Sequence, residues 1–167
     1  MTTRKVTRMI SSVAMVSLLI GLFAFVLPAP SLAAGQPLFT GNVGFLAGGV
    51  VYRAGFNVKV LDAQHTAQGW YSSRDANGDW FTVNVTCAHI MANEVHFHGL
   101  ITSASDPSLV GQTFHGVLQD NGTAARSGDK IWAAIEATHT CEHNSGTMTM
   151  PAGGPHDVIS GNFQIIA

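Results

Sequence analysis

Residues 80–101 read WFTVNVTCAHIMANEVHFHGLI, and this stretch carries the clearest folding signal in the chain. Apolar and polar side chains alternate through residues 80–87 and again through 94–101. Side chains two positions apart lie on one face of a β-strand. The residues MAN between the two runs are typical of a tight turn. The stretch therefore predicts two antiparallel strands joined as a hairpin.

The alternation also assigns each side chain to one face of its strand. In the second run, one face carries Val95, Phe97, Gly99 and Ile101, and the other carries His96, His98, Leu100 and Thr102. In the first run, Phe81, Val83, Val85 and Cys87 share one face, and Trp80, Thr82, Asn84 and Thr86 share the other. We therefore expect Phe97 in the core and both histidines on the opposite face.

Similar short segments recur at residues 41–47, 54–61, 66–73, 112–119, 130–137 and 161–167. Turn-forming residues separate them, as in RDANGD (74–79), SASDPS (103–108) and DNGTAARSGD (120–129). No ten-residue stretch has clean helical periodicity. Eight strands with short connections predict a single all-β domain, built either as an antiparallel barrel or as a sandwich.

The N-terminal segment has the three parts of a secretory signal peptide. Arg4, Lys5 and Arg8 precede an apolar run over residues 9–27, which ends at Pro28 and is followed by SLAA (31–34). We expect cleavage after Ala33, which leaves residues 34–167 as the mature domain. The alternative is an uncleaved anchor, because a run of about 20 apolar residues spans a bilayer.

Charge and export limit the partners. The chain has 8 basic and 10 acidic residues, and cleavage removes three basic residues and no acidic one, which leaves 5 against 10, or a net charge of −5. This balance argues against nucleic acid as a partner. We expect a secreted or cell-surface protein whose partner is an extracellular ligand or surface component, with no membrane insertion after cleavage.

The order of these segments resembles the post-COAP type of small secreted bacterial β-domains. The resembling parts are AGFNVKV (54–60), GWYSSRD (69–75), residues 81–101, LQDNGTAARSGDK (118–130) and SGNFQIIA (160–167). The resemblance implies an all-β fold and an extracytoplasmic setting, and it implies no activity. His96 and His98 are not part of that pattern.

Histidines suggest a metal site. His96 and His98, at i and i+2 on one strand face, have the spacing of two ligands to one ion, and imidazole suits copper, zinc and nickel. A second cluster in residues 139–156 adds His139, His143, Met148, Met150 and His156 beside Cys141. The alternative is a set of surface histidines and a Gly-rich loop. We expect no cofactor for the main hypothesis and copper or zinc for the metal hypothesis.

Other patterns favour structure over chemistry. RDANGD lacks the Gly and Glu of a calcium loop and fits a hairpin turn at Asn77-Gly78. Asp120, Asn121 and Asp129 are typical turn residues. No serine lies in Gly-x-Ser-x-Gly and no two acids are paired by the sequence, so no catalytic residue is assigned.

The tryptophans Trp70, Trp80 and Trp132, together with Tyr71, are either core or ligand-stacking residues, and size favours the core. If a barrel keeps an open mouth, an apolar ligand can occupy it.

The two cysteines, Cys87 and Cys141, predict a disulfide, since an exported protein meets an oxidising compartment. In the competing hypothesis Cys141 is a metal ligand. The sequence thus favours an exported, non-catalytic β-domain with a binding or structural role. An extracytoplasmic copper- or zinc-binding protein is the alternative, and a small barrel enzyme with an unidentified site is the third hypothesis.

Overall fold

The fold is an all-β barrel of eight strands. The computed structural model describes residues 36–122, 128–136 and 154–166. The strands are β1 (Leu38–Ala47), β2 (Val50–Val60), β3 (Thr66–Asp75), β4 (Trp80–Met91), β5 (Glu94–Ala104), β6 (Thr113–Gln119), β7 (Lys130–Glu136) and β8 (His156–Ile166). A short 3-10 helix, η1 (Pro107–Leu109), lies between β5 and β6. The predicted signal peptide, residues 1–33, lies outside the described residues.

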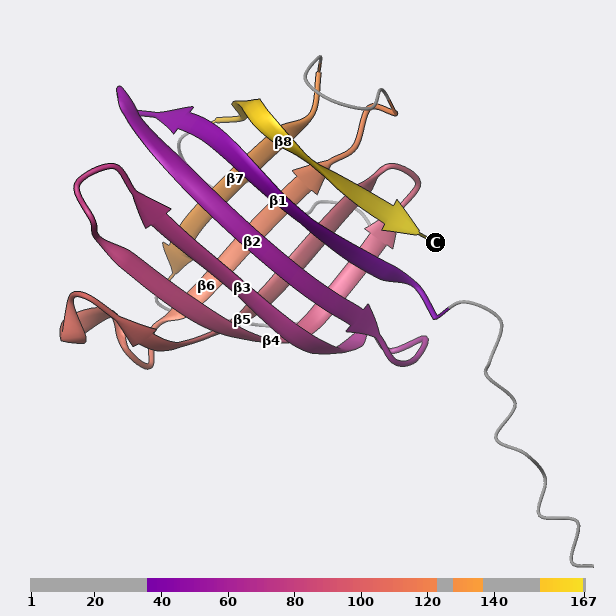
Figure 1. Cartoon of the computed structure of the whole chain (residues 1–167). Coiled ribbons are helices and arrows are strands. Elements are labelled where there is room, and N and C mark those ends of the chain that lie inside the picture. Colours follow the sequence, from indigo (N-terminus) through magenta and orange to yellow (C-terminus); the bar gives the residue numbers. More distant parts are fainter. Residues whose placement is uncertain (1–35, 123–127, 137–153, 167) are drawn as a thin grey trace, which may run out of the picture. The chain divides into compact units, whose positions relative to one another are not determined.

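Each strand pairs with its neighbour in sequence, and β8 returns to β1, so the sheet closes on itself. All pairings are antiparallel, and the closing pair runs from Leu38 against Ile166 to Phe45 against Val158. Figure 1 shows the strands in this order around the barrel. The barrel is therefore confirmed over the sandwich. Closure pairs most strand edges, and among the described residues the exception is the β7–β8 contact, where only Lys130–Asp157 and Ile131–His156 are register pairs.

The interior is filled by alternate side chains of the strands, as the sequence pattern predicts. Val95, Phe97 and Ile101 are at most 1% exposed. The fully buried core is aromatic at its centre, where Phe97 contacts Phe39, Tyr71 and Phe114. The Phe97 ring lies against Gly116 of β6, where a methyl group would come within 2.3 Å of the ring. The absence of a side chain at Gly116 thus makes room for the ring.

One face assignment was wrong, and the cause is a β-bulge in β4. The β4–β5 register shifts between Val85 and Cys87, so that Cys87 pairs with His98 and Ala88 pairs with Phe97. A bulge inserts one extra residue and reverses the alternation beyond it. Cys87 therefore lies on the outer face with His98, and not with the core residues Val83 and Val85.

The expectation that the tryptophans lie in the core was also mostly wrong. Trp70 is 45% exposed and Trp80 is 40% exposed, whereas Trp132 is 7% exposed. Tyr71, in contrast, is a core residue with 1% exposure. The alternation explains both results for β3, because Trp70 and Tyr71 are adjacent and must point to opposite faces.

The RDANGD segment forms the β3–β4 hairpin turn, as expected. The Asp75 carboxylate accepts hydrogen bonds from the backbone N–H groups of Asn77 (2.8 Å) and Asp79 (2.9 Å). Gly78 has a φ of +99°, which favours glycine. Among the described residues, no helix is long and apolar enough to cross a membrane.

Candidate functional site

His96 and His98 both lie on the outer face of β5, as the alternation predicts, and they have histidine neighbours on the adjacent strands. His96 pairs with His89 of β4, and His98 pairs with His115 of β6. The rings of His98 and His115 stack with centroids 4.0 Å apart, and those of His65 and His89 are 4.1 Å apart. These five residues are called the histidine face below.

The histidine face is more buried than an outer face usually is. His96 is 1% exposed and His115 is 4% exposed. The Glu94 carboxylate lies 2.6 Å from Nε2 of His96, which places the ring proton at Nε2. Nδ1 of His96 is buried, and it has no hydrogen-bond partner among the described residues. The sequence did not indicate this burial, because alternation assigns a face and not its exposure.

The remaining predicted ligands are not placed with this cluster. His139, His143, Met148 and Met150 lie outside the described residues, as does Cys141. Within the described ranges, no group of three or more His, Cys, Asp or Glu side chains is arranged around a position for a metal ion. The structure thus brings His96 and His98 together with three other histidines, and leaves the second predicted cluster untested.

The predicted Asp-Asn-Gly loop after β6 has a structural role where it is described. The Asp129 carboxylate is buried and accepts a hydrogen bond from the backbone N–H of Asn121 at 3.0 Å. Asp120 accepts a hydrogen bond from the backbone N–H of Gly122 at 2.9 Å. These bonds are those of a turn.

A cavity of about 340 Å³ opens at the end of the barrel that carries the β1–β2 and β3–β4 turns. This end is called the mouth, and the hollow is called the inner cavity. Its wall is mainly aromatic and apolar, and its lining residues are Phe45, Ala47, Tyr52, Tyr71, Ser73, Phe81, Phe114, Ala133, Ala134, Ile135 and His156. Seven of the eight strands contribute to it, so only the closed barrel creates it.

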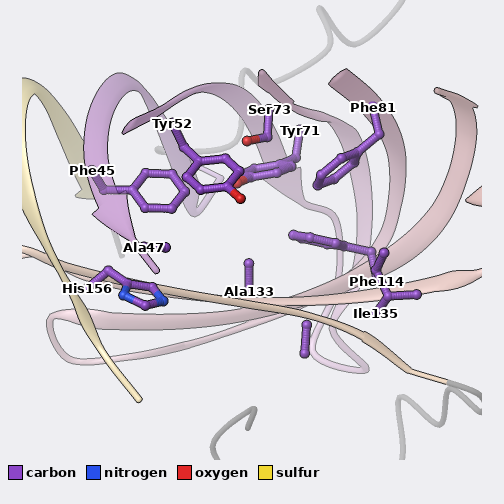
Figure 2. Close-up of a pocket in the computed structure, with 11 residues that line it drawn as sticks. Phe45, Ala47, Tyr52, Tyr71, Ser73, Phe81, Phe114, Ala133, Ile135 and His156 are labelled. Carbon is purple, nitrogen blue, oxygen red and sulfur yellow. The ribbon is translucent and has the colours of Figure 1, made fainter. Parts of the chain in front are cut away.

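The aromatic rings form two groups across the inner cavity (Figure 2). Phe45 and Tyr52 stack with centroids 5.2 Å apart and an interplanar angle of 14°. Opposite them, Tyr71 stacks on Phe114 at 4.8 Å, and Phe81 contacts Phe114 at 5.3 Å. Rings held by such contacts form a rigid apolar wall suited to a flat or aliphatic ligand.

The Tyr71 hydroxyl is the unusual polar group of this wall. Tyr71 is 1% exposed, and its hydroxyl is buried without a hydrogen bond of acceptable geometry. In Figure 2 the hydroxyl end of Tyr52 points toward the middle of the cavity, and the Tyr71 ring lies behind the Tyr52 ring in this view. Burial raises the pKa of the Tyr71 phenol well above its ordinary value, and the neighbouring Ser73 hydroxyl opposes this only in part. The phenol is therefore a neutral donor at physiological pH.

A second hollow of about 470 Å³, called the vestibule, adjoins the inner cavity. Tyr52, Ser73 and Phe81 line both hollows. The other lining residues of the vestibule come from the end of β3, the β3–β4 turn, the start of β4 and the β5–β6 connection with η1, and they are Asp75, Asp79, Trp80, Ser105, Asp106 and Leu109. The site at the mouth thus has an aromatic interior and an acidic entrance.

Sequence reasoning raised an open mouth in general terms but did not identify its residues. The available signal was the set of aromatic residues near the predicted strand ends. In comparisons with known proteins, no family model, no curated protein and no solved structure matches the chain. The resemblance to the post-COAP type of domain therefore stays a prediction.

Proposed function

We propose that this protein is an exported, non-catalytic binding protein that holds a small, largely apolar ligand in the mouth of its barrel. The observation that carries this proposal is the aromatic inner cavity, whose wall contains the buried Tyr71 phenol, a donor that makes no hydrogen bond of acceptable geometry among the described residues. A buried hydroxyl without a hydrogen bond costs about 1–3 kcal/mol. A ligand with an acceptor atom at this position offsets that cost, so the wall favours the occupied state.

The size of the hollow supports the same proposal. Ligand cavities in proteins usually measure about 300–1,000 Å³ and combine apolar walls with a few polar groups that orient the ligand. The inner cavity measures about 340 Å³. Its polar groups are the hydroxyls of Tyr52, Tyr71 and Ser73, together with the His156 imidazole.

Titration with a neutral fluorescent probe, N-phenyl-1-naphthylamine, tests the proposal. We expect saturable binding of one probe per chain, with a rise in fluorescence on transfer to the apolar wall. Ala133 points into the inner cavity in Figure 2, so Ala133→Phe is expected to fill it and abolish binding. Leu100→Phe is the matched control, because Leu100 is 48% exposed on the outer face of β5. Binding that survives Ala133→Phe, or no binding to the wild-type chain, would contradict the proposal.

A second candidate function is binding of copper or zinc at the histidine face. The observation that favours it is the contact between Glu94 and Nε2 of His96, with Nδ1 buried on a ring whose centroid lies 5.8 Å from that of His115. A carboxylate that holds one ring nitrogen while the other faces an ion is a common feature of metal sites.

Calorimetric titration with Zn²⁺ and Cu²⁺ tests this second function. We expect one ion per chain, and loss of binding in the His98→Ala/His115→Ala variant. His156→Ala is the control, because His156 lines the inner cavity at the mouth. A chain that stays metal-free, with an unchanged melting temperature on addition of either ion, argues against the metal function.

The extracytoplasmic setting remains part of the proposal. It is supported by the sequence of residues 1–33 and by the even number of cysteines. We infer a Cys87–Cys141 disulfide, in which Cys87 lies buried on the outer face of β4. N-terminal sequencing of the exported protein, expected to begin at Ala34, tests the first inference. Thiol titration of the unfolded, unreduced chain tests the second, for which we expect no free thiol.

A further inference from the structure

The vestibule places three carboxylates at the entrance of the inner cavity. Asp75 lies at the end of β3, Asp79 in the β3–β4 turn and Asp106 before η1, so two separate connections contribute them. No Lys or Arg among the described residues lines either hollow. Arg74 follows the outer face of β3 and lines a different surface hollow, to which Asp75 also contributes. Within the described ranges, the other titratable groups of the walls are the phenols of Tyr52 and Tyr71, and His156 in the inner cavity.

The hydrogen bonds of these carboxylates orient them without neutralising them. Asp79 accepts a hydrogen bond from the Ser105 hydroxyl at 3.1 Å, and Asp106 accepts one from the backbone N–H of Ser108 at 2.9 Å. Both donors are neutral, so the negative charge remains. The bonds to Ser108 also lower the pKa of the Asp106 carboxyl. The entrance therefore keeps its negative charge at neutral pH.

Aromatic faces adjoin the carboxylates. Trp80 is 40% exposed beside Asp79, and Tyr52 and Phe81 continue the wall into the inner cavity. The negative face of an aromatic ring attracts a cation, and Trp is the strongest of these rings. Carboxylates and ring faces in one hollow favour the same ligand group, an organic ammonium, and disfavour an anion. Independently of the acids, the buried Tyr71 hydroxyl favours a ligand with an acceptor atom in the adjoining cavity, because it makes no hydrogen bond of acceptable geometry among the described residues.

We propose that the ligand of the mouth carries a positive charge: it is an aromatic or aliphatic ammonium compound whose apolar body occupies the inner cavity and whose cationic group lies in the vestibule. This inference rests on the proposed function of the inner cavity. The charged group sits among Asp75, Asp79 and Asp106 and over the face of Trp80, and the body packs against the rings of the wall. Neutral ligands of the same shape bind more weakly, and anionic ones more weakly still.

Three probes of matched shape test the sign of the charge. They are phenethyltrimethylammonium, its neutral carbon isostere (3,3-dimethylbutyl)benzene, and 3-phenylpropanoate. Affinities are measured by protein-detected NMR titration at about 0.01 M and about 1 M salt, where the screening length is about 30 Å and 3 Å respectively. We expect the cation to bind about tenfold more tightly than the isostere at low salt, and this preference to shrink at high salt.

Variants locate the source of the preference. Asp79→Asn and Asp106→Asn keep the shape and the hydrogen-bond acceptors, so the turns are preserved, which circular dichroism and the melting temperature verify. The double variant is expected to lose most of the preference for the cation while its affinity for the neutral isostere stays the same. Asp62→Asn is the control, because Asp62 lies in the β2–β3 turn at the other end of the barrel. It is expected to keep the preference.

The outcomes separate this inference from the proposed function. Equal affinity for all three probes, or preference for the anion, overturns the cationic ligand while the binding function of the cavity stands. A preference for the cation that persists in the double variant also overturns the inference, because its source then lies elsewhere. Binding of none of these probes, together with no binding of N-phenyl-1-naphthylamine, overturns both.

Discussion

At the scale of single residues, the ring and the hydroxyl of Tyr71 have opposite effects on the stability of the empty protein. Its ring is part of the core and contacts Phe97 and Phe114. Its hydroxyl, however, is buried near Ser73 and makes no hydrogen bond of acceptable geometry among the described residues. A group that weakens the empty protein and strengthens the occupied one is typical of a binding site, where stability is lower than the fold allows.

Replacing Tyr71 by Phe is expected to separate these two effects. Tyr71→Phe removes the unsatisfied hydroxyl and keeps the ring, so the free energy of unfolding of the empty protein rises by about 1 kcal/mol. Affinity for ligands that carry an acceptor atom falls roughly fivefold, as expected for loss of a hydrogen bond of about 1 kcal/mol. Denaturant unfolding and ligand titration measure the two changes. A variant that is both less stable and equally tight in binding contradicts this role.

The raised pKa of Tyr71 also predicts a loss of stability in alkali. In the unfolded chain the phenol ionises near its ordinary value of 10.0, whereas in the folded protein burial keeps it protonated at higher pH. The folded state then binds more protons than the unfolded state, so stability falls as pH rises above this value, by up to about 1.4 kcal/mol per pH unit. Below it, this contribution is fully present. The stability of Tyr71→Phe is expected to fall less over the same alkaline range in parallel denaturant titrations.

At the scale of strands, side chains on neighbouring strands fix each other in the core. Phe97 of β5 and Gly116 of β6 are register partners. A methyl group on Gly116 would lie 2.3 Å from the Phe97 ring, which is too close for two non-bonded carbon atoms. Because the ring is fully buried and touches other rings, it has little space to move.

We expect Gly116→Ala to lower the free energy of unfolding by about 1–3 kcal/mol through overpacking. Phe97→Leu alone removes ring contacts and is also destabilising. The double variant is expected to be more stable than the sum of the two changes predicts, since the smaller side chain leaves room for the methyl group. A double-mutant cycle by urea unfolding measures this coupling. Additive changes would show that the two residues do not compete for space.

Strands were the level at which the sequence was most informative. Alternation placed Phe97 inside and His96 outside, because a strand has a fixed period of two. The same rule misplaced Cys87, since the bulge adds one residue and nothing in the run TVNVTC distinguishes the extra one. Trp70 and Trp80 were misplaced for another reason: size favours burial on average, but their neighbours Tyr71 and Phe81 take the inner positions.

At the scale of the whole molecule, the inner cavity forms only when the barrel closes, and for this reason the sequence did not predict it. Phe45 of β1 and His156 of β8 are more than a hundred residues apart in the sequence, yet their rings lie 6.1 Å apart on one wall. No short sequence pattern indicates that two residues so far apart in the chain are in contact. Alternation, in contrast, is local, and for this reason the strands could be predicted and the cavity could not.

The β7–β8 pairing is the short seam of the barrel. Within the described residues only two register pairs join these strands, Lys130 with Asp157 and Ile131 with His156. The Lys130–Asp157 ion pair is partly exposed and adds little to stability. On its other side β8 pairs with β1 along most of its length. The barrel is therefore expected to open at this seam first.

Native-state hydrogen exchange is expected to detect this opening. Backbone amides of β7 are predicted to exchange faster than those of β2 and β3, which are paired along most of their length on both sides. Ala133, Ala134 and His156 lie at the seam and also line the inner cavity, so a bound ligand is expected to slow exchange in β7. Uniform protection across all strands would show that the seam is as stable as the rest.

The β1–β8 pairing also determines where the barrel can be attached to a support relative to its mouth. Leu38 and Ile166 are paired at the end of the barrel opposite the mouth. A tether joined just before β1 or just after β8 is therefore attached at the end of the barrel opposite the mouth. Attachment to a support, a fusion partner or a cell envelope through either position leaves the mouth pointing away from the attachment point, so the strand topology sets the orientation of the barrel.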